Sequence, residues 1–248
     1  LAKGFVVDDL MYKHWDEWLN DAPHPFIADF DGTSIGEGKD MLEGTIYDCP
    51  NRPFGGAEQL AWSNDSKQIA YSCNKKSGRD YTLSTDTDIY LYDLTSGTTT
   101  NLCKIDEERS SYGYDNAPQF SPDGKEVAFL EDRTTLRVIN LKSKNIRTVL
   151  DGKYNYSYSD GDVSFSWSPD SKWFLAKYIA IGGWNNTDIA LVKADGSGEI
   201  HNLTESGYTD ASPRWVLGGK AMIWSSDRAG FRSHGSWGSH RDIYIMFF

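Results

Sequence analysis

One short phrase occurs four times along this chain, and it limits the possible folds more than any other feature. Each copy joins an aromatic residue to a turn of the Ser-Pro-Asp-Gly-Lys kind and then to an aliphatic run, and the aromatic positions are Trp62, Phe120, Trp167 and Trp215. These positions lie 58, 47 and 48 residues apart. An apolar strand, a tight turn and a returning apolar strand predict a β-hairpin. A hairpin repeated at this period indicates a repeat architecture.

The stretches after each hairpin extend it to a larger sheet. A third apolar strand follows every hairpin, and a fourth follows the first three. The predicted third strands are residues 88–94, 136–141, 188–193 and 242–248, and the predicted fourth strands are residues 98–102, 146–150 and 199–204. This pattern predicts an all-β fold, a β-propeller of about five whole or partial blades, each a four-stranded antiparallel sheet.

The two ends of the chain are predicted to be incomplete blades of a single domain, residues 1–248. The expected divisions are residues 1–56 (partial), 57–115, 116–160, 161–210 and 211–248 (partial). Residues 10–15 and 25–30 have the pattern of the middle strands of the first blade. The N-terminal residues could supply the missing outer strand of the last blade and close the ring, because open sheet edges favour aggregation. The alternative, which we favour, is an arc excised from a larger propeller.

Composition excludes several classes of protein. The first 125 residues carry 22 acidic and 11 basic side chains, which is the whole net charge of −11. An acidic surface argues against nucleic acid as a partner. The sequence contains no run of 18 apolar residues, so no membrane span is predicted, and the first residues show no signal-peptide pattern. Three cysteines at irregular spacing predict neither a disulfide framework nor a zinc site, although one disulfide remains possible in an oxidising compartment.

The repeated phrase, together with Asp-Ile-Tyr at residues 88–90 and 242–244, resembles the TolB-type propeller repeat, which also builds the non-catalytic propellers of several serine peptidases. Residues 5–124 resemble the propeller of dipeptidyl-peptidase-like members of the prolyl oligopeptidase group, through residues 10–18, 53–56 and 88–94. Residues 125–248 resemble tricorn-like peptidases, through residues 130–141, 154–162 and 224–238. The resemblance changes from one group to the other at residues 118–125, where the net charge of the sequence also changes. Two explanations stay open: a mosaic of two proteins, or one family that carries both sets of features.

The resemblance implies a function as a gate that positions peptide substrates for a separate catalytic domain. It implies peptides or such a domain as partners, a periplasmic or secreted location, and no cofactor. Two other classes stay open. One is a stand-alone TolB-type module that binds proteins in the periplasm, and the other is a propeller enzyme with carboxylates around its axis, for which no motif is found.

No catalytic or metal site is predicted. Residues 32–36, Gly-Thr-Ser-Ile-Gly, match the form of a nucleophile elbow around Ser34, but no helical pattern follows them. Ser236 with His234 or His240 could imitate a nucleophile and its base, but a Gly-rich loop is the simpler interpretation. Carboxylates at residues 29–32 and 86–88 lack the later Glu of a calcium loop.

The candidate binding residues lie in four loops rich in aromatic residues, which are common at recognition surfaces. The first group lies near the N-terminus, the second in residues 151–163, and two single tryptophans lie in later loops. They are His14, Trp15 and Asp16; Tyr154, Tyr156 and Tyr158; Trp184; and Trp237. Packing between blades is the alternative role for each of these aromatic residues.

Overall fold

The computed structural model describes residues 4, 6–7, 12–14, 16–103, 113–183, 185–231 and 239–248. Three four-stranded sheets and one three-stranded sheet follow one another along the chain, and every pairing within them is antiparallel between consecutive strands. Sheet I contains β5 (Leu60–Trp62), β6 (Gln68–Cys73), β7 (Asp88–Asp93) and β8 (Thr99–Asn101). Sheet II contains β9 (Asn116–Phe120), β10 (Glu126–Glu131), β11 (Thr135–Asn140) and β12 (Ile146–Leu150).

Sheet III contains β13 (Phe165–Trp167), β14 (Trp173–Tyr178), β15 (Asp188–Lys193) and β16 (His201–Asn202). Sheet IV contains β17 (Asp210–Val216), β18 (Ala221–Ser226) and β19 (Asp242–Phe247). The predicted all-β architecture of antiparallel four-stranded sheets is therefore confirmed. Three short 3₁₀ segments accompany the strands: η1 (Ala57–Gln59), η2 (Gly152–Tyr154) and η3 (Leu217–Gly219).

One α-helix is found among the described residues, α1 (Gly78–Leu83), in the connection between β6 and β7. Its six residues are far fewer than the roughly 20 that a membrane-spanning helix needs, and no helix in the described ranges could cross a bilayer.

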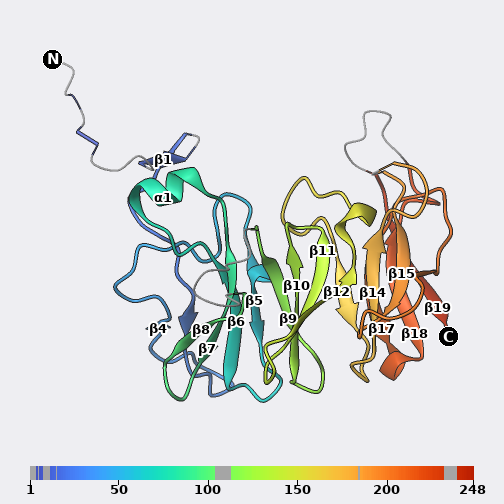
Figure 1. Ribbon diagram of the computed structural model, residues 1–248, viewed down its shortest axis with the longest axis horizontal. Coiled ribbons are helices and arrows are strands. Elements are labelled where there is room, and N and C mark those ends of the chain that lie inside the picture. Colours follow the sequence, from blue (N-terminus) through green and yellow to red (C-terminus); the bar gives the residue numbers. More distant parts are fainter. Residues whose placement is uncertain are drawn as a thin grey trace.

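The four sheets stand side by side with their faces against one another (Figure 1). Three apolar clusters fill the spaces between them, and the side chains of a strand enter the clusters on both of its faces. In β10, Val127 and Phe129 face sheet I, whereas Ala128 and Leu130 face sheet III, and all four are almost fully buried. A strand buried on both faces needs a continuous apolar run. This explains the aliphatic half of the repeated phrase.

The polar half of the phrase forms a hydrogen-bonded turn. The Ser168 hydroxyl oxygen accepts hydrogen bonds from the backbone N–H groups of Lys172 (3.2 Å) and Trp173 (2.9 Å), while the hydroxyl donates to Asp170 (2.6 Å). Ser63 makes the same three contacts in sheet I, and Ser121 in sheet II donates to Asp123 and accepts from the Glu126 N–H. The fourth copy has no serine here, and η3 replaces the turn.

The repeated tryptophans also join neighbouring sheets. The indole N–H of Trp167 donates to the carbonyl of Gln119 (3.3 Å), and that of Trp215 donates to the carbonyl of Ser166 (3.1 Å). In each case the acceptor directly precedes the aromatic position of the previous sheet. The indole therefore fixes the offset between one inner strand and the next.

The N-terminal segment does not form the predicted blade. Within the part of the chain that the structure describes, β1 (Lys13–His14) pairs only with β2 (Glu17–Trp18), and β3 (Phe26–Ile27) only with β4 (Lys39–Asp40). The prediction that residues 10–15 and 25–30 are middle strands of one blade is therefore wrong. Met41, Leu42 and Cys49 instead pack as irregular chain against the outer face of sheet I.

The ring is not closed by the residues that the structure describes. Among the described residues, β19 pairs with β18 alone. Residues 1–3, 5 and 8–11, which include those that could supply an outer strand to the last blade, lie outside the described residues. On the outer face of sheet IV, Ile243 is 70% exposed, whereas its equivalent Ile189 is fully buried beneath sheet IV. Sheet IV has an apolar outer face of the kind that other sheets bury.

We expect Ser168→Ala to lower the free energy of unfolding by about 1 kcal/mol, because the Trp173 N–H loses its side-chain acceptor and the Lys172 N–H retains only Asp170. Chemical denaturation monitored by tryptophan fluorescence measures this. Ser77→Ala is the matched control, because Ser77 is exposed and its side chain makes no capping hydrogen bond. Equal effects of the two substitutions would contradict the assigned role of the turn.

Candidate functional site

The longest connections between strands gather on one face of the molecule, at the top of Figure 1, which we call the upper face. They include α1 and the loop before β13. The lower face carries the short Ser-Asp turns. Because loops on a rigid scaffold are free to carry binding groups, the upper face is where a site is expected.

Asp160, in the loop between β12 and β13, is the centre of a buried polar cluster on this face. Its side chain has no exposed surface and accepts hydrogen bonds from Arg133 Nε (2.7 Å) and the Tyr114 hydroxyl (2.7 Å). Gln59 Nε2 (3.1 Å) and Asn116 Nδ2 (3.3 Å) complete its partners. These donors come from η1, from β9 and the residues before it, and from the turn between β10 and β11. A single carboxylate thus joins three sheets.

The cluster continues into the N-terminal segment. Gln59 Oε1 accepts hydrogen bonds from the backbone N–H (2.7 Å) and side chain (3.0 Å) of Asn51, and Asn51 Oδ1 accepts from the backbone N–H of Asn74 (2.9 Å). The Arg133 guanidinium lies 3.9 Å from the centre of the Tyr114 ring. Burial, together with the hydrogen bond to Asp160, raises the pKa of the Tyr114 phenol. Tyr114 therefore stays protonated and donates to the carboxylate.

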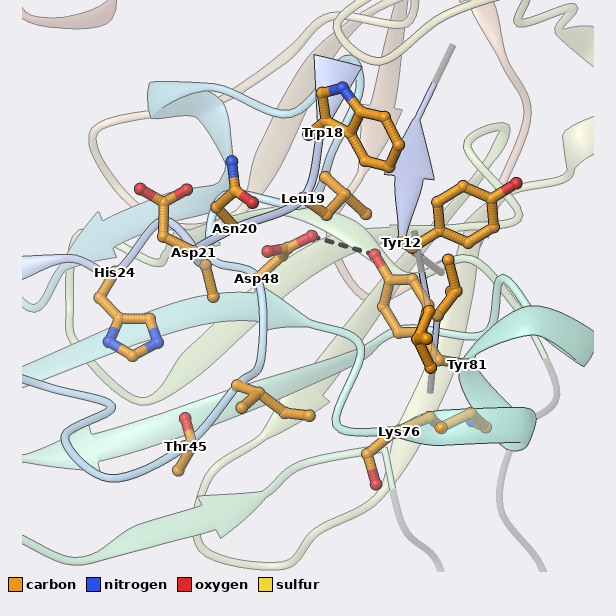
Figure 2. Close-up of a pocket in the computed structure, with 16 residues that line it drawn as sticks. Tyr12, Trp18, Leu19, Asn20, Asp21, His24, Thr45, Asp48, Lys76 and Tyr81 are labelled. Carbon is orange, nitrogen blue, oxygen red and sulfur yellow. Dashed lines mark hydrogen bonds between the residues drawn. The ribbon is translucent and has the colours of Figure 1, made fainter. Parts of the chain in front are cut away.

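A cavity of about 880 Å³ opens beside this network, between the β1–β2 hairpin and α1 (Figure 2). Its lining combines aromatic and aliphatic side chains with a few polar groups. The lining residues are Val6, Val7, Tyr12, Trp18, Leu19, Asn20, Asp21, Ala22, His24, Thr45, Ile46, Asp48, Lys76, Ser77, Gly78 and Tyr81. Such a mixture is typical of ligand pockets of roughly 300–1,000 Å³.

Aromatic side chains form one wall of the cavity. Tyr12 and Trp18 flank the hairpin turn, with ring centres 5.8 Å apart, and Trp18 is half exposed. Lys13 Nζ lies 5.7 Å from the Trp18 ring. This wall can cover an apolar group that enters from solvent.

The opposite wall presents fixed hydrogen-bonding groups. The Tyr81 hydroxyl donates to Asp48 (3.0 Å), as Figure 2 shows, and Arg52 approaches the other oxygen of Asp48 (3.5 Å) while donating to the carbonyl of Asp21. Burial and the charge of Asp48 raise the pKa of Tyr81. Lys76 pairs with Asp86 at 2.5 Å.

His24 adds a further polar atom to the lining. His24 Nδ1 lies 2.8 Å from Asp40 Oδ2, and Nε2 is buried without a protein partner among the described residues. Burial acts to raise the pKa of Asp40, but the hydrogen bonds from His24 and from the Leu42 N–H outweigh it and hold that pKa below its ordinary value. The carboxylate therefore fixes the orientation of the imidazole.

The predicted site residues fall in different places. Asp16 lies exposed in the β1–β2 turn next to the cavity, whereas the side chain of His14 is not described. Five other residues lie outside the described part of the chain: Trp15, Trp184, His234, Ser236 and Trp237. Tyr154 is half-buried against the core between sheets II and III. Tyr156 and Tyr158 are exposed by 55% and 72% and do not line the cavity.

Sequence reasoning missed most of the cavity and the role of Asp160. Tyr12, Trp18, His24, Asp48 and Tyr81 were not among the predicted binding residues, because they meet only when the N-terminal segment folds over α1. Ser34 lies in an exposed turn in which its hydroxyl donates to Asp31 (2.9 Å), closed by a bridge between Phe30 and Ile35. This is not the strand–turn–helix geometry of a nucleophile elbow.

One group of potential metal ligands is found among the described residues: Asp88, Cys103 and Asp115, with ligand atoms within 4.8 Å of one another. A structural role explains it. Asp188, Thr204 and Asp210 occupy the equivalent positions of the later repeat, where Thr204 accepts from the Ile189 N–H (3.1 Å), as Cys103 Sγ accepts from the Ile89 N–H (3.4 Å). The cluster ties the third strand to the loop that leads to the next sheet.

Comparison with known proteins follows the fold and the site. No known family model matches this chain. It is 42% identical over 221 residues to a dipeptidyl-peptidase 5 of Porphyromonas gingivalis, which takes in 86% of this chain and 31% of that protein. A dipeptidyl-peptidase 5 of Porphyromonas endodontalis is 50% identical over 122 residues, 49% of this chain and 17% of that protein. The chain therefore spans about a third or less of the curated relatives that it matches most strongly.

Solved structures show the fold. TolB from Acinetobacter baumannii matches 90% of this chain and 45% of its own, with a TM-score of 0.54 and 23% identity. The tricorn protease matches 90% of this chain and 19% of its own, with a TM-score of 0.58 and 14% identity. The fold is a β-propeller. The predicted resemblance to TolB-type, tricorn and dipeptidyl-peptidase propellers is thereby confirmed.

The similarity to dipeptidyl-peptidase 5 is not confined to one half of the chain. An alignment over 86% of the chain must include residues on both sides of residues 118–125. One relative thus carries both sets of features, and the change of resemblance there does not require a mosaic of two proteins.

We expect Asp160→Asn to lower the free energy of unfolding by about 2 kcal/mol, because the charge that compensates Arg133 in a buried cluster is removed. Urea denaturation measures the change. Asp16→Asn, at an exposed carboxylate next to the cavity, should leave the midpoint unchanged. Equal midpoints for the two variants would show that Asp160 does not join the sheets.

Asp115 should make stability depend on pH. Burial raises its pKa from 3.8 to about 7, so the folded chain binds the proton more tightly than the unfolded chain. The contribution of this group is fully present below about pH 4 and is lost as pH rises through about 7. Urea denaturation at a series of pH values should show a smaller decrease between these limits in Asp115→Asn. Asp210→Asn is the control, because Asp210 is ion-paired with Arg228 (3.1 Å) and its loss should destabilise the chain. An unaltered profile in Asp115→Asn would contradict this assignment.

Proposed function

We propose that this chain is the non-catalytic propeller portion of a serine peptidase similar to dipeptidyl-peptidase 5, and that it gates or positions peptide substrates for a separate catalytic domain. The observation that carries this proposal is the 42% identity over 86% of the chain to a protein of that name, of which this chain covers 31%. The propeller fold supports it, because the chain is built of stacked sheets whose long loops share one face.

The cavity beneath the β1–β2 hairpin is the part of this face that best suits a peptide. Its aromatic wall can cover an apolar side chain, and its polar wall offers oriented donors and acceptors for the peptide backbone. Pockets combine these two features when they select both the shape and the orientation of a ligand. The partners proposed are therefore peptides and a peptidase catalytic domain, without a cofactor. The proposed location is periplasmic or secreted, supported by the resemblance to TolB-type propellers.

Trp18→Ala should weaken peptide binding by roughly tenfold, because an exposed aromatic anchor at the mouth of a pocket is a common binding hot spot. Fluorescence anisotropy with a pool of labelled short peptides measures the affinity. Trp62→Ala is the matched control, since Trp62 is also half exposed but lies on β5, away from the cavity. Equal affinities for the two variants would remove the cavity from the proposal.

Two further outcomes would redirect the proposal. Hydrolysis of fluorogenic peptides by this chain, abolished by Ser34→Ala or Ser236→Ala, would show that the chain is itself catalytic. Capture of a tight, stoichiometric protein partner, with no effect of added peptide, would favour a TolB-type interaction module. A reading frame that continues into a peptidase domain would favour the gate.

A further inference from the structure

Two of the three cysteines meet where the N-terminal segment packs on sheet I. Cys73 is the last residue of β6, and Cys49 belongs to the irregular chain that covers the outer face of that sheet. Both side chains are fully buried in one apolar cluster with Met41, Tyr71 and Tyr90. They are 24 positions apart in the sequence but lie on two parts of the chain that share no strand pairing.

The sulfur of Cys73 contacts the backbone next to Cys49. Cys73 Sγ lies 3.4 Å from the carbonyl oxygen of Asp48, which belongs to the peptide group that ends at the nitrogen of Cys49. Burial is the main cause that raises the pKa of the Cys49 thiol, and the neighbouring thiol of Cys73 is the second. Cys49 lies outside every strand, so no ladder of sheet hydrogen bonds holds its backbone away from disulfide geometry.

The third cysteine is separated from this pair by the sheet itself. Cys103 belongs to the cluster between sheets I and II, with Ile89 and Leu91, and its sulfur accepts a hydrogen bond from the Ile89 N–H. Cys73 belongs to the opposite face, with Tyr71 and Tyr90. Cys103 therefore cannot replace either partner while sheet I is intact.

We propose that Cys49 and Cys73 form a disulfide that fastens the N-terminal segment to the first blade under oxidising conditions, although both thiols are reduced in the structure. With glutathione disulfide as the oxidant, one cysteine thiolate attacks a glutathione sulfur and releases one glutathione thiolate. The second cysteine thiolate then attacks the mixed disulfide and releases the other. One S–S bond forms, and two electrons and two protons pass to the two glutathione thiols.

Burial determines when this bond can form. Burial raises the pKa of Cys73 to about 12, so hardly any thiolate is present in the folded chain at neutral pH. Attack by a buried thiol is slow, because the thiolate is the nucleophile. The bond is therefore expected to form as the chain folds, before the N-terminal segment covers Cys73, and to resist reductants afterwards.

The test is oxidative refolding of the whole chain with reduced and oxidised glutathione, followed by alkylation, digestion and mass spectrometry. The expected result is one linked peptide pair, Cys49 with Cys73, and an alkylated Cys103. The Cys103→Ser variant should form the same link, and neither Cys49→Ser nor Cys73→Ser should form an intramolecular bond. The oxidised chain should unfold at a temperature roughly 5–10 °C higher than the reduced chain, because the bond closes a loop of about 25 residues.

Three results would overturn the proposal. They are three free thiols after oxidative refolding of a chain that shows the native fluorescence spectrum, a dominant link to Cys103, or a link between Cys49 and Cys73 that lowers the unfolding temperature. Because the measurement uses disulfide mapping and not peptide binding, its outcome is independent of the proposed function.

Discussion

Each of sheets I to IV is apolar on both faces, so each is stable only with something packed against both sides. Sheets II and III meet this condition with their neighbours, and their middle strands are almost fully buried. Sheet I meets it differently, because an irregular segment that includes the short β3–β4 hairpin covers its outer face. Sheet IV keeps exposed isoleucines on its outer face. The stacking requirement explains the order of the fold and also why its two ends differ.

The sequence predicted the parts of this fold that are encoded locally. The hairpins around Trp62, Phe120, Trp167 and Trp215, and the strands after them, depend on turn residues and apolar runs that lie within a few positions of one another. The first blade was predicted wrongly, because aromatic density in residues 10–30 has the same pattern in a strand and in an irregular segment packed on a sheet. Local patterns cannot distinguish the two.

The candidate site was harder to predict for a related reason. Asp160 and Gln59 are 101 positions apart, and neither has a sequence context that marks it as part of a polar cluster. Tyr156 and Tyr158 attracted attention because they are aromatic, yet the carboxylate two residues later makes the structural contacts. The cavity beside α1 combines the N-terminal hairpin with a loop of sheet I, and its residues become neighbours only through tertiary packing.

Equivalent arginines in two repeats have taken different partners. Arg228 bonds to Asp210, which precedes the aromatic position of its own sheet, whereas Arg133 reaches across to Asp160 in the loop that leads to the next sheet. The backbones of these two repeats correspond, but one arginine pairs with a carboxylate of its own sheet and the other with a carboxylate in the loop to the next sheet. Sheet II is consequently not an interchangeable module: moving it to another place in the row would separate Arg133 from Asp160, whereas sheet IV carries both members of its ion pair with it.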